Sequence, residues 1–177
     1  MERHGGVWFS QEIWLPENRL SELCDLGVQF VAHSGMENAV TNSIMRGRPY
    51  GGLCLAWSPD LDHVIRPLVN YRHERIVCVE SAANPHPLLF VSVYMPYFNS
   101  AKRQECIAET IETISMLEEI ISDHPFHQLI IRGDFNTEMK GYSPFDSLWA
   151  DFTAKHYMTC CEQQQHQLYV LPRIAES

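Results

Sequence analysis

Asp134 and Asn136 stand two residues apart just after a short apolar run, and together they could carry acid–base chemistry. The run, Leu-Ile-Ile at 129–131, is typical of a buried strand, and Gly133 permits a sharp exit from it. On an extended segment this spacing puts both side chains on one face and points Phe135 toward the core. A carboxylate beside a carboxamide supplies a base and a donor–acceptor pair, at a strand end where ligands of α/β sheets usually bind. An Asx turn that closes the strand would explain the same residues.

Four short motifs, the last of which contains these two residues, follow one another along the chain. They are Ser-Gln-Glu-Ile-Trp-Leu at 10–15, Gly-Arg-Pro-Tyr-Gly-Gly at 47–52, Ser-Val-Tyr-Met-Pro at 92–96 and Gly-Asp-Phe-Asn at 133–136. In this order and spacing they resemble the endonuclease/exonuclease/phosphatase superfamily. The first two look most like the apurinic-type endonuclease domain of non-LTR retrotransposons. The resemblance covers residues 6–141.

The resemblance implies an α/β fold, a two-sheet sandwich that is incomplete at its N- and C-termini. Residues 1–155 would form the partial domain, and residues 156–177 would be an unmatched tail. The implied reaction is hydrolysis of a phosphodiester that depends on Mg²⁺ or Mn²⁺, with nicking of DNA as its outcome. If the chain is active, DNA is therefore the expected partner.

The family pattern also implies roles for single residues. Glu12, the Glu of the Gln-Glu pair, would bind the metal ion, since magnesium prefers oxygen ligands and one or two carboxylates suffice. Asp134 would activate water, and Asn136 would hold water or a phosphate oxygen. Tyr94 would donate a hydrogen bond to a phosphate oxygen as charge builds. Position alone leaves Glu12 open as a surface residue at a strand end, and Tyr94 as a core aromatic bonded to a carbonyl.

Basic residues that could hold phosphates are few. Lysine and arginine number 13 against 22 acidic residues, and the formal net charge is −9. This charge counts against a generic nucleic-acid binder but leaves room for a nuclease with a local basic strip. Arg48 and Arg103 are candidates for substrate binding, although Arg48 stands in a turn whose glycines and proline have a structural role first. The strip could also include Arg46, Arg66, Arg72, Arg75 and Lys102, although for each of them alone a solvated surface charge is the plainer explanation.

Two parts of the family pattern lack a match, and this opens alternative functions. The first strand, with its metal-side Asn, has no counterpart, and the triplet Ser122-Asp123-His124 precedes the Asp-x-Asn strand instead of following it. A helix C-terminus with a favourable histidine is the simpler account of the triplet. Losing a preorganised donor costs about two to three orders of magnitude in rate. An inactive remnant or binding module of the same fold is therefore the alternative, and a phosphoesterase acting on lipid or inositol phosphate is a further one.

Length and composition predict one folded domain. The chain has 177 residues and is 45% hydrophobic, enough for a sizeable core. No apolar run approaches the roughly 20 residues that span a bilayer, and the N-terminus lacks a signal-peptide h-region. We therefore expect no membrane partner and an intracellular location, nuclear if the chain acts as a retroelement endonuclease. Six cysteines without a C-x-x-C pair are expected to be reduced thiols, several of them buried.

Hydrophobic periodicity predicts the elements that position these residues. Strands are expected at 7–12, 28–32, 53–57, 63–69, 75–80 and 88–94, with 63–69 and 75–80 as hairpin partners and 88–94 central. One helix follows Pro16 and ends at Gly27. A longer helix begins at an N-cap, Ser100, and ends near residue 122, with an apolar stripe of Ile107, Ile111, Ile114, Leu117 and Ile121. Missing terminal strands would leave unpaired strand edges.

Overall fold

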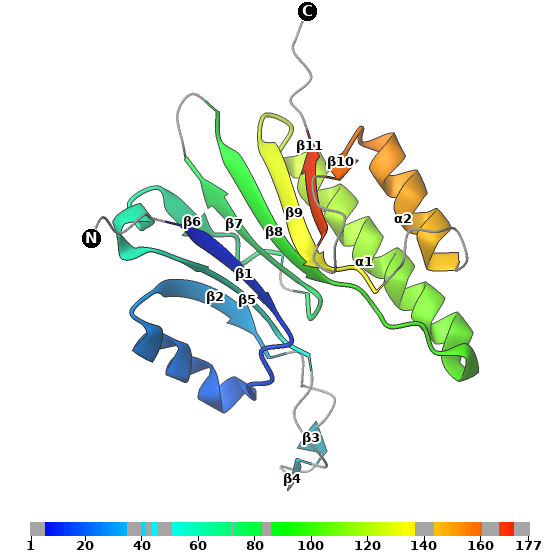
Figure 1. Ribbon diagram of the computed structural model, residues 1–177, viewed down its shortest axis with the longest axis horizontal. Helices are drawn as coiled ribbons and strands as arrows, with labels where there is room; N and C mark the ends of the chain where they lie inside the picture. The colour runs from blue at the N-terminus through cyan, green and yellow to red at the C-terminus, as the bar shows by residue number, and fades with distance from the viewer. Residues whose placement is uncertain are drawn as a thin grey trace, which may run out of the picture.

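Two β-sheets pack face to face, and helices cover the outer side of the larger sheet (Figure 1). The computed structural model describes residues 6–34, 40–41, 44–45, 51–71, 73–82, 86–136, 144–160 and 167–171. The smaller, antiparallel sheet has the order β1 (Val7–Gln11), β5 (Leu53–Trp57), β2 (Gln29–His33). The 3-10 helix η1 (Glu17–Leu26) contacts β2. A two-stranded ribbon is formed by β3 (Val40–Thr41) and β4 (Ile44–Met45).

The larger sheet has six strands in the order β10-β11-β9-β8-β7-β6. Their bounds are β6 (Ile65–Pro67), β7 (Ile76–Ser81), β8 (Leu88–Tyr94), β9 (Gln128–Asp134), β10 (Thr159–Cys160) and β11 (Gln167–Leu171). β8 and β9 run parallel, and the other neighbours are antiparallel. The connection from β8 to β9 contains the long helix α1 (Arg103–Asp123), and α2 (Pro144–Lys155) packs beside it. Short 3-10 turns, η3 (Pro59–Leu61) and η4 (Ser100–Lys102), complete the described elements.

Alternation of side chains along β7 and β8 divides the interior into two cores. Ile76 and Cys78 face the helices, whereas Val77 and Val79 face the smaller sheet. The helix-side core also takes in Phe135, Trp149 and Phe152, and the rings of Phe135 and Trp149 lie 4.4 Å apart. A strand buried on both faces has to be apolar throughout, which explains the near-continuous hydrophobic run of β8.

The predicted two-sheet α/β architecture is confirmed, together with the hairpin of β6 and β7 and the central position of β8. Gly27 ends η1 in the left-handed conformation, with φ 67°, but the segment before it is a 3-10 helix. Phe135 points into the core as expected, with 4% of its surface exposed. Among the described cysteines, Cys54, Cys78 and Cys106 are buried free thiols. No helix in the described part of the chain is long and apolar enough to cross a membrane.

One prediction about the long helix is wrong, and another is only partly confirmed. The residue before α1 is Lys102, whose side chain makes no capping hydrogen bond. Ser100 is the first residue of η4, and the side-chain oxygen of Asn99 caps that turn by accepting a hydrogen bond from the Ala101 N–H at 3.0 Å. The buried side chains are Cys106, Thr110, Thr113, Leu117 and Ile120, whereas Ile111 is 47% exposed. Buried threonines are tolerated because their hydroxyls donate to the carbonyls four residues earlier. Of the predicted stripe, Leu117 is buried, and Ile114 and Ile121 are partly buried and pack against the core, so the prediction is wrong chiefly for Ile111.

The segment after residue 155 contributes strands to the larger sheet. β11 pairs antiparallel with β9 from Gln167↔Gly133 to Leu171↔Leu129, and β10 pairs with β11. The expectation of an unpaired edge is therefore wrong for β9. The domain boundary at residue 155 stays a prediction.

Candidate active site

Parallel pairing of β8 with β9 brings the ends of both strands to the same level. Tyr94 is the register partner of Asp134, and the Met95 N–H donates to the Asp134 carbonyl at 2.8 Å. Gly133 makes this approach possible, since a Cβ there would lie 1.9 Å from the Val93 carbonyl oxygen. The glycine of the Gly-Asp-Phe-Asn motif is therefore required by packing between the two strands that carry the site.

Asn136 turns the chain immediately after β9. Its backbone has φ 47°, and its N–H donates to Asp134 Oδ1 at 3.0 Å, which is an Asx turn. The side-chain Nδ2 donates to the Met95 carbonyl at 2.7 Å, so the turn is tied to the end of β8. The Asx turn is present, and it also fixes the Asp134 carboxylate beside Tyr94.

Glu12 reaches the site from the smaller sheet. Just after β1, Glu12 and Trp14 both adopt φ 54°, and the Ile13 and Trp14 N–H groups donate to the carbonyls of Gly52 and Gly51. Gly52 has φ 91°, and a Cβ on it would lie 2.7 Å from Ile13. The glycines of the second motif thus shape the turn that presents Glu12.

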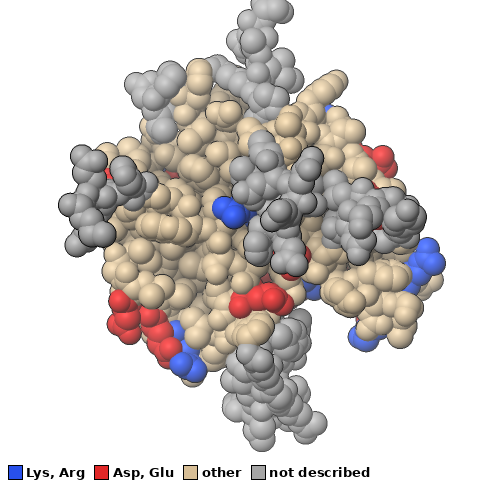
Figure 2. Space-filling view, viewed as in Figure 1, with Lys and Arg blue, Asp and Glu red and all other residues tan. Residues whose placement is uncertain are grey.

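Two side-chain hydrogen bonds join the end of β1 to the end of β8. The Tyr94 hydroxyl donates to Glu12 Oε1 at 3.1 Å, and Gln11 Nε2 donates to Ser92 Oγ at 2.9 Å. Three motifs distant in sequence therefore converge through Glu12, Tyr94 and Asp134. Figure 2, drawn from the same side as Figure 1, shows acidic side-chain atoms on the viewed face of the molecule, close to where β1 and β9 end in Figure 1.

The electrostatic environment of Tyr94 is negative. Burial raises the pKa of its phenol to about 12, the charge and hydrogen bond of Glu12 and the charge of Asp134 act in the same direction, and a hydrogen bond with Asn136 opposes them. Tyr94 therefore keeps its proton near neutral pH and remains a hydrogen-bond donor. A negative potential at this place also suits a cation.

The oxygen donors at the site fit a hard divalent cation. Magnesium keeps several waters and is usually bound through one or two carboxylates, and the carboxylate of Glu12 meets that requirement. No three His, Cys, Asp or Glu side chains among the described residues gather into a group that could hold a metal ion. A site of this kind would thus depend on water and substrate oxygens for most of its ligands.

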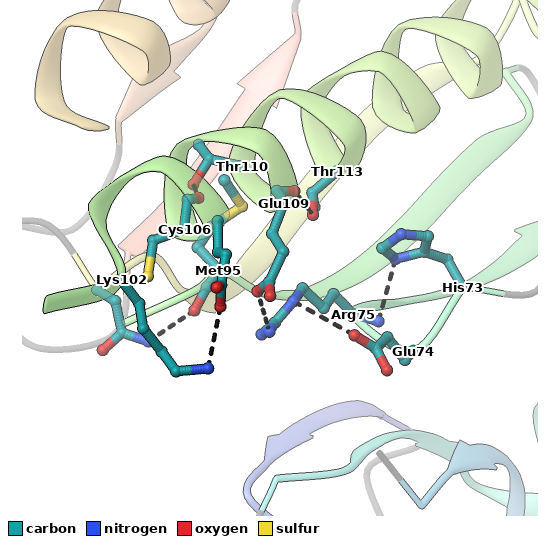
Figure 3. Close-up of polar contacts among 11 residues, drawn as sticks. His73, Glu74, Arg75, Met95, Lys102, Cys106, Glu109, Thr110 and Thr113 are labelled. Carbon is teal, nitrogen blue, oxygen red and sulfur yellow. Dashed lines mark hydrogen bonds and ion pairs between the residues drawn. The ribbon is translucent and has the colours of Figure 1, made fainter. Parts of the chain in front are cut away.

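Among the described residues of the predicted basic strip, Arg103, Arg75 and Lys102 make no hydrogen bond or ion pair with Glu12, Tyr94 or Asp134 that the structure shows. Arg103, the first residue of α1, is exposed, and no hydrogen bond or ion pair of the described residues joins it to Glu12, Tyr94 or Asp134. Figure 3 shows Arg75 reaching Glu109 of α1, 2.7 Å away, with Glu74 on its other side, and Lys102 lies 2.9 Å from Glu105. Arg46, Arg48 and Arg72 lie outside the described residues.

The Ser122-Asp123-His124 triplet lies at the other end of the larger sheet. It ends α1 and precedes Gln128, the first residue of β9, so the seven-residue strand, about 20 Å long, separates it from Asp134. The Asp123 carboxylate accepts a hydrogen bond from the Tyr71 hydroxyl, and His124 Nδ1 pairs with the Ile120 carbonyl. The helix-terminus account of the triplet is the correct one.

Sequence reasoning missed the contacts that hold the site together. The Gln11–Ser92 hydrogen bond and the anchoring of Asn136 on the Met95 carbonyl join residues 81 and 41 positions apart. In the sequence, the only indication of these contacts was that each of the residues lies close to one of the motifs. The left-handed backbone at Glu12 and Trp14 had no signal, because neither residue type favours it.

The fold and this site define the chain as an α/β sandwich with an acidic, oxygen-rich site where strands of both sheets end. No protein-family model matches the sequence, and no curated protein matches it. Solved structures do match, although their identity to this chain is low. The human Nocturnin catalytic domain, solved with a bound sulfate anion, has a TM-score of 0.61 and 11% identity, over 93% of this chain and 68% of that one.

Two further structures extend the likeness. The endonuclease domain of TRAS1, a telomere-specific non-LTR retrotransposon, has a TM-score of 0.54 and 13% identity, over 81% of this chain and 66% of that one. The 3′ phosphatase NExo from Neisseria, bound to a product DNA hairpin, has a TM-score of 0.57 and 12% identity, over 94% and 76%. All three belong to the endonuclease/exonuclease/phosphatase superfamily. This chain has the fold of that superfamily, and the predicted resemblance is confirmed at that level.

Proposed function

We propose that this chain hydrolyses phosphodiesters with the help of a divalent metal ion and nicks DNA, as a retrotransposon-type endonuclease would. The observation that carries the proposal is the hydrogen bond from Tyr94 to Glu12 beside the Tyr94–Asp134 register pair. It gathers a carboxylate for a metal ion, a carboxylate base and a protonated phenol at one sheet end. Such an arrangement matches what phosphodiester cleavage needs.

Each side chain has a defined part in the proposed reaction. A bound Mg²⁺ or Mn²⁺ would act as a Lewis acid on a phosphate oxygen, and Glu12 would hold it. Asp134 accepts a proton from the attacking water, whose oxygen bonds to phosphorus while the bond to the leaving oxygen breaks; that oxygen keeps the bonding electron pair and takes up a proton from solvent water. Tyr94 donates a hydrogen bond to a phosphate oxygen as negative charge develops. Asn136, fixed on the Met95 carbonyl, orients Asp134 through its backbone N–H.

DNA is the proposed substrate because of the motifs as well as the fold. The Gln-Glu-x-Trp-Leu and Arg-Pro-Tyr-Gly-Gly segments resemble retrotransposon endonucleases, and the chain also has the fold of the TRAS1 endonuclease domain. An endonuclease of this type would act in the nucleus. The motif resemblance favours DNA over a lipid or inositol phosphate.

Nicking of supercoiled plasmid tests the proposal. Protein with a cooperative thermal melt is incubated with plasmid and Mg²⁺, with EDTA as one control. Asp134→Ala should abolish nicking and leave the melting temperature nearly unchanged, because Asp134 is partly exposed at a strand end. Asp25→Ala is the matched control, since this carboxylate is exposed in η1, away from the site.

Three outcomes would contradict the proposal. Equal nicking by Asp134→Ala and wild type would remove Asp134 from the reaction. A folded wild-type chain that does not nick would instead support an inactive member of this fold that acts by binding. Hydrolysis of a lipid phosphodiester without plasmid nicking would keep the site and change the substrate.

A further inference from the structure

Arg132 lies on the same face of β9 as Asp134, two residues nearer the start of the strand. Side chains alternate along β9, so Leu129 and Ile131 are buried on the helix side while Arg132 and Asp134 are partly exposed on the opposite face. Two residues along a strand span about 7 Å. The Arg132 side chain therefore extends from the same face of β9 as the Asp134 carboxylate, next to the candidate active site.

The backbone of Arg132 is held from both sides. Its register partners are Ser92 on β8 and Leu168 on β11, so it stands on an interior strand of the sheet. Ser92 is fully buried and accepts a hydrogen bond from Gln11, one residue before Glu12. Arg132 thus lies on a backbone that is hydrogen-bonded on both sides, two residues before Asp134, and is well placed to position a ligand.

The charges at the site call for a cation besides any metal ion. Glu12 and Asp134 both act on Tyr94 as negative groups, and a phosphodiester approaching them is itself an anion. Arg75 pairs with Glu109, Lys102 with Glu105 and Lys155 with Glu118, and none of these three ion pairs includes Glu12 or Asp134. Arg66 follows Ile65, which packs between the sheets, and so lies on the opposite face of edge strand β6.

We propose that Arg132 binds a backbone phosphate of the nucleic acid next to the scissile one. The proposal rests on the proposed function, because it assigns a substrate contact to the same site. A planar guanidinium can donate two parallel hydrogen bonds to phosphate oxygens, and an ammonium group cannot reproduce that fork. Arg132 would thus supply both charge and orientation, and it selects substrates that carry more than one phosphate.

Salt-dependent DNA binding tests the contact without requiring turnover. The affinity for a fluorescein-labelled 20-base-pair duplex is measured by anisotropy in EDTA between 50 and 200 mM salt. Each phosphate contact contributes about 0.9 to the slope of log affinity against log salt. Arg132→Gln should reduce that slope by about one and weaken binding, whereas Arg132→Lys should keep the slope while losing part of the affinity. Arg19→Gln, which removes the same charge from exposed η1, should leave the slope unchanged.

The outcomes separate this inference from the proposed function. An unchanged slope in Arg132→Gln overturns the phosphate contact, even if that variant melts at a lower temperature, since a structural role alone would lower stability only. An equal loss in Arg19→Gln also overturns it, because net charge would then explain the effect. Absence of measurable binding by the wild-type chain overturns it as well. Normal binding with the expected slope change but no plasmid nicking refutes catalysis and leaves Arg132 as a phosphate-binding residue.

Discussion

Replacing Gly133 with alanine tests how closely β8 and β9 must approach beside the candidate site. An ideal Cβ on Gly133 would lie 1.9 Å from the Val93 carbonyl oxygen, 2.7 Å from Val93 Cγ1 and 2.8 Å from the Val93 carbonyl carbon. Real Cβ atoms essentially never show contacts under 3.0 Å. The two strands would therefore have to separate by about 1 Å at this pair, inside a close-packed sheet.

The expected cost follows from what would have to move. Overpacking usually costs about 1–3 kcal/mol, and we expect about 3 kcal/mol or more because the clash is with main chain. In a chain of this size 1 kcal/mol corresponds to about 2–4 °C, so the melting temperature should fall by about 6–12 °C or more. The displacement also reaches the neighbouring Tyr94–Asp134 pair. Because a 1 Å misplacement can cost about 100-fold in rate, nicking by the molecules that remain folded should fall by about that factor.

Thermal and urea denaturation followed by circular dichroism measure the effect, with Gly27→Ala as the matched control. Gly27 has φ 67° but nothing lies within 4 Å of its Cβ position, so that substitution should cost only about 1–2 kcal/mol for the left-handed backbone. Gly133 is not among the glycines with positive φ, and its cost should come from the clash. The reasoning is refuted if Gly133→Ala melts with the wild type, or loses no more stability than Gly27→Ala.

Two further substitutions test the site and the helix that lies behind it. Tyr94→Phe should lower kcat by about 10²–10³-fold with little change in KM, because the variant loses a hydrogen-bond donor to the developing charge. Steady-state nicking kinetics measure this effect. An unchanged kcat would show that the phenol takes no part in the reaction. Because the pKa of Tyr94 is raised to about 12, its proton should persist through pH 10, where an ordinary tyrosine is half ionised. A kcat/KM profile that falls with a midpoint near pH 10 in the wild type, but not in Tyr94→Phe, would contradict the raised pKa. Asn99→Ala should lower the free energy of unfolding by about 1 kcal/mol because Asn99 is the cap of η4. Ser100→Ala should change that stability little. Equal melting temperatures for the two variants would contradict Asn99 as the capping residue.

The strands that carry the site were predictable because each has an unambiguous local signal. β8 is an apolar run that only a doubly buried strand accommodates, and the structure has it at Leu88–Tyr94 as expected. β5 has the predicted bounds, Leu53–Trp57. Motif order then placed Glu12, Tyr94 and Asp134 at strand ends, and parallel pairing of β8 with β9 brings two of them level.

The features that could not be predicted depend on long-range packing. The buried face of α1 includes Thr110 and Thr113, which satisfy their hydroxyls within the helix and so behave as apolar residues. Ile111 and Ile114 lie instead beside Leu148 and Phe152 of α2, in a groove between the two helices. Hydrophobicity alone could not show that α1 divides its apolar surface between a sheet and a neighbouring helix. β11 follows polar residues 163–165; its own sequence, Gln-Leu-Tyr-Val-Leu, contains strand-favouring residues that sequence reasoning missed, and its pairing with β9 places it in the larger sheet.

Backbone strain at the strand ends indicates that these segments are shaped by the geometry of a site and are not simple turns. An Asx turn accounts for the φ of 47° at Asn136, a residue type that tolerates the left-handed region. It does not account for φ 54° at Glu12 and at Trp14, where the cost is about 1–3 kcal/mol each. That strain persists because Gly51 and Gly52 accept hydrogen bonds from the residues after Glu12, and Gly52 leaves room for Ile13. If Glu12 were merely a surface residue at a strand end, a relaxed turn would serve equally well. The strained turn instead carries Glu12 to the Tyr94 hydroxyl, as expected where the geometry of a site, and not local preference, determines the backbone.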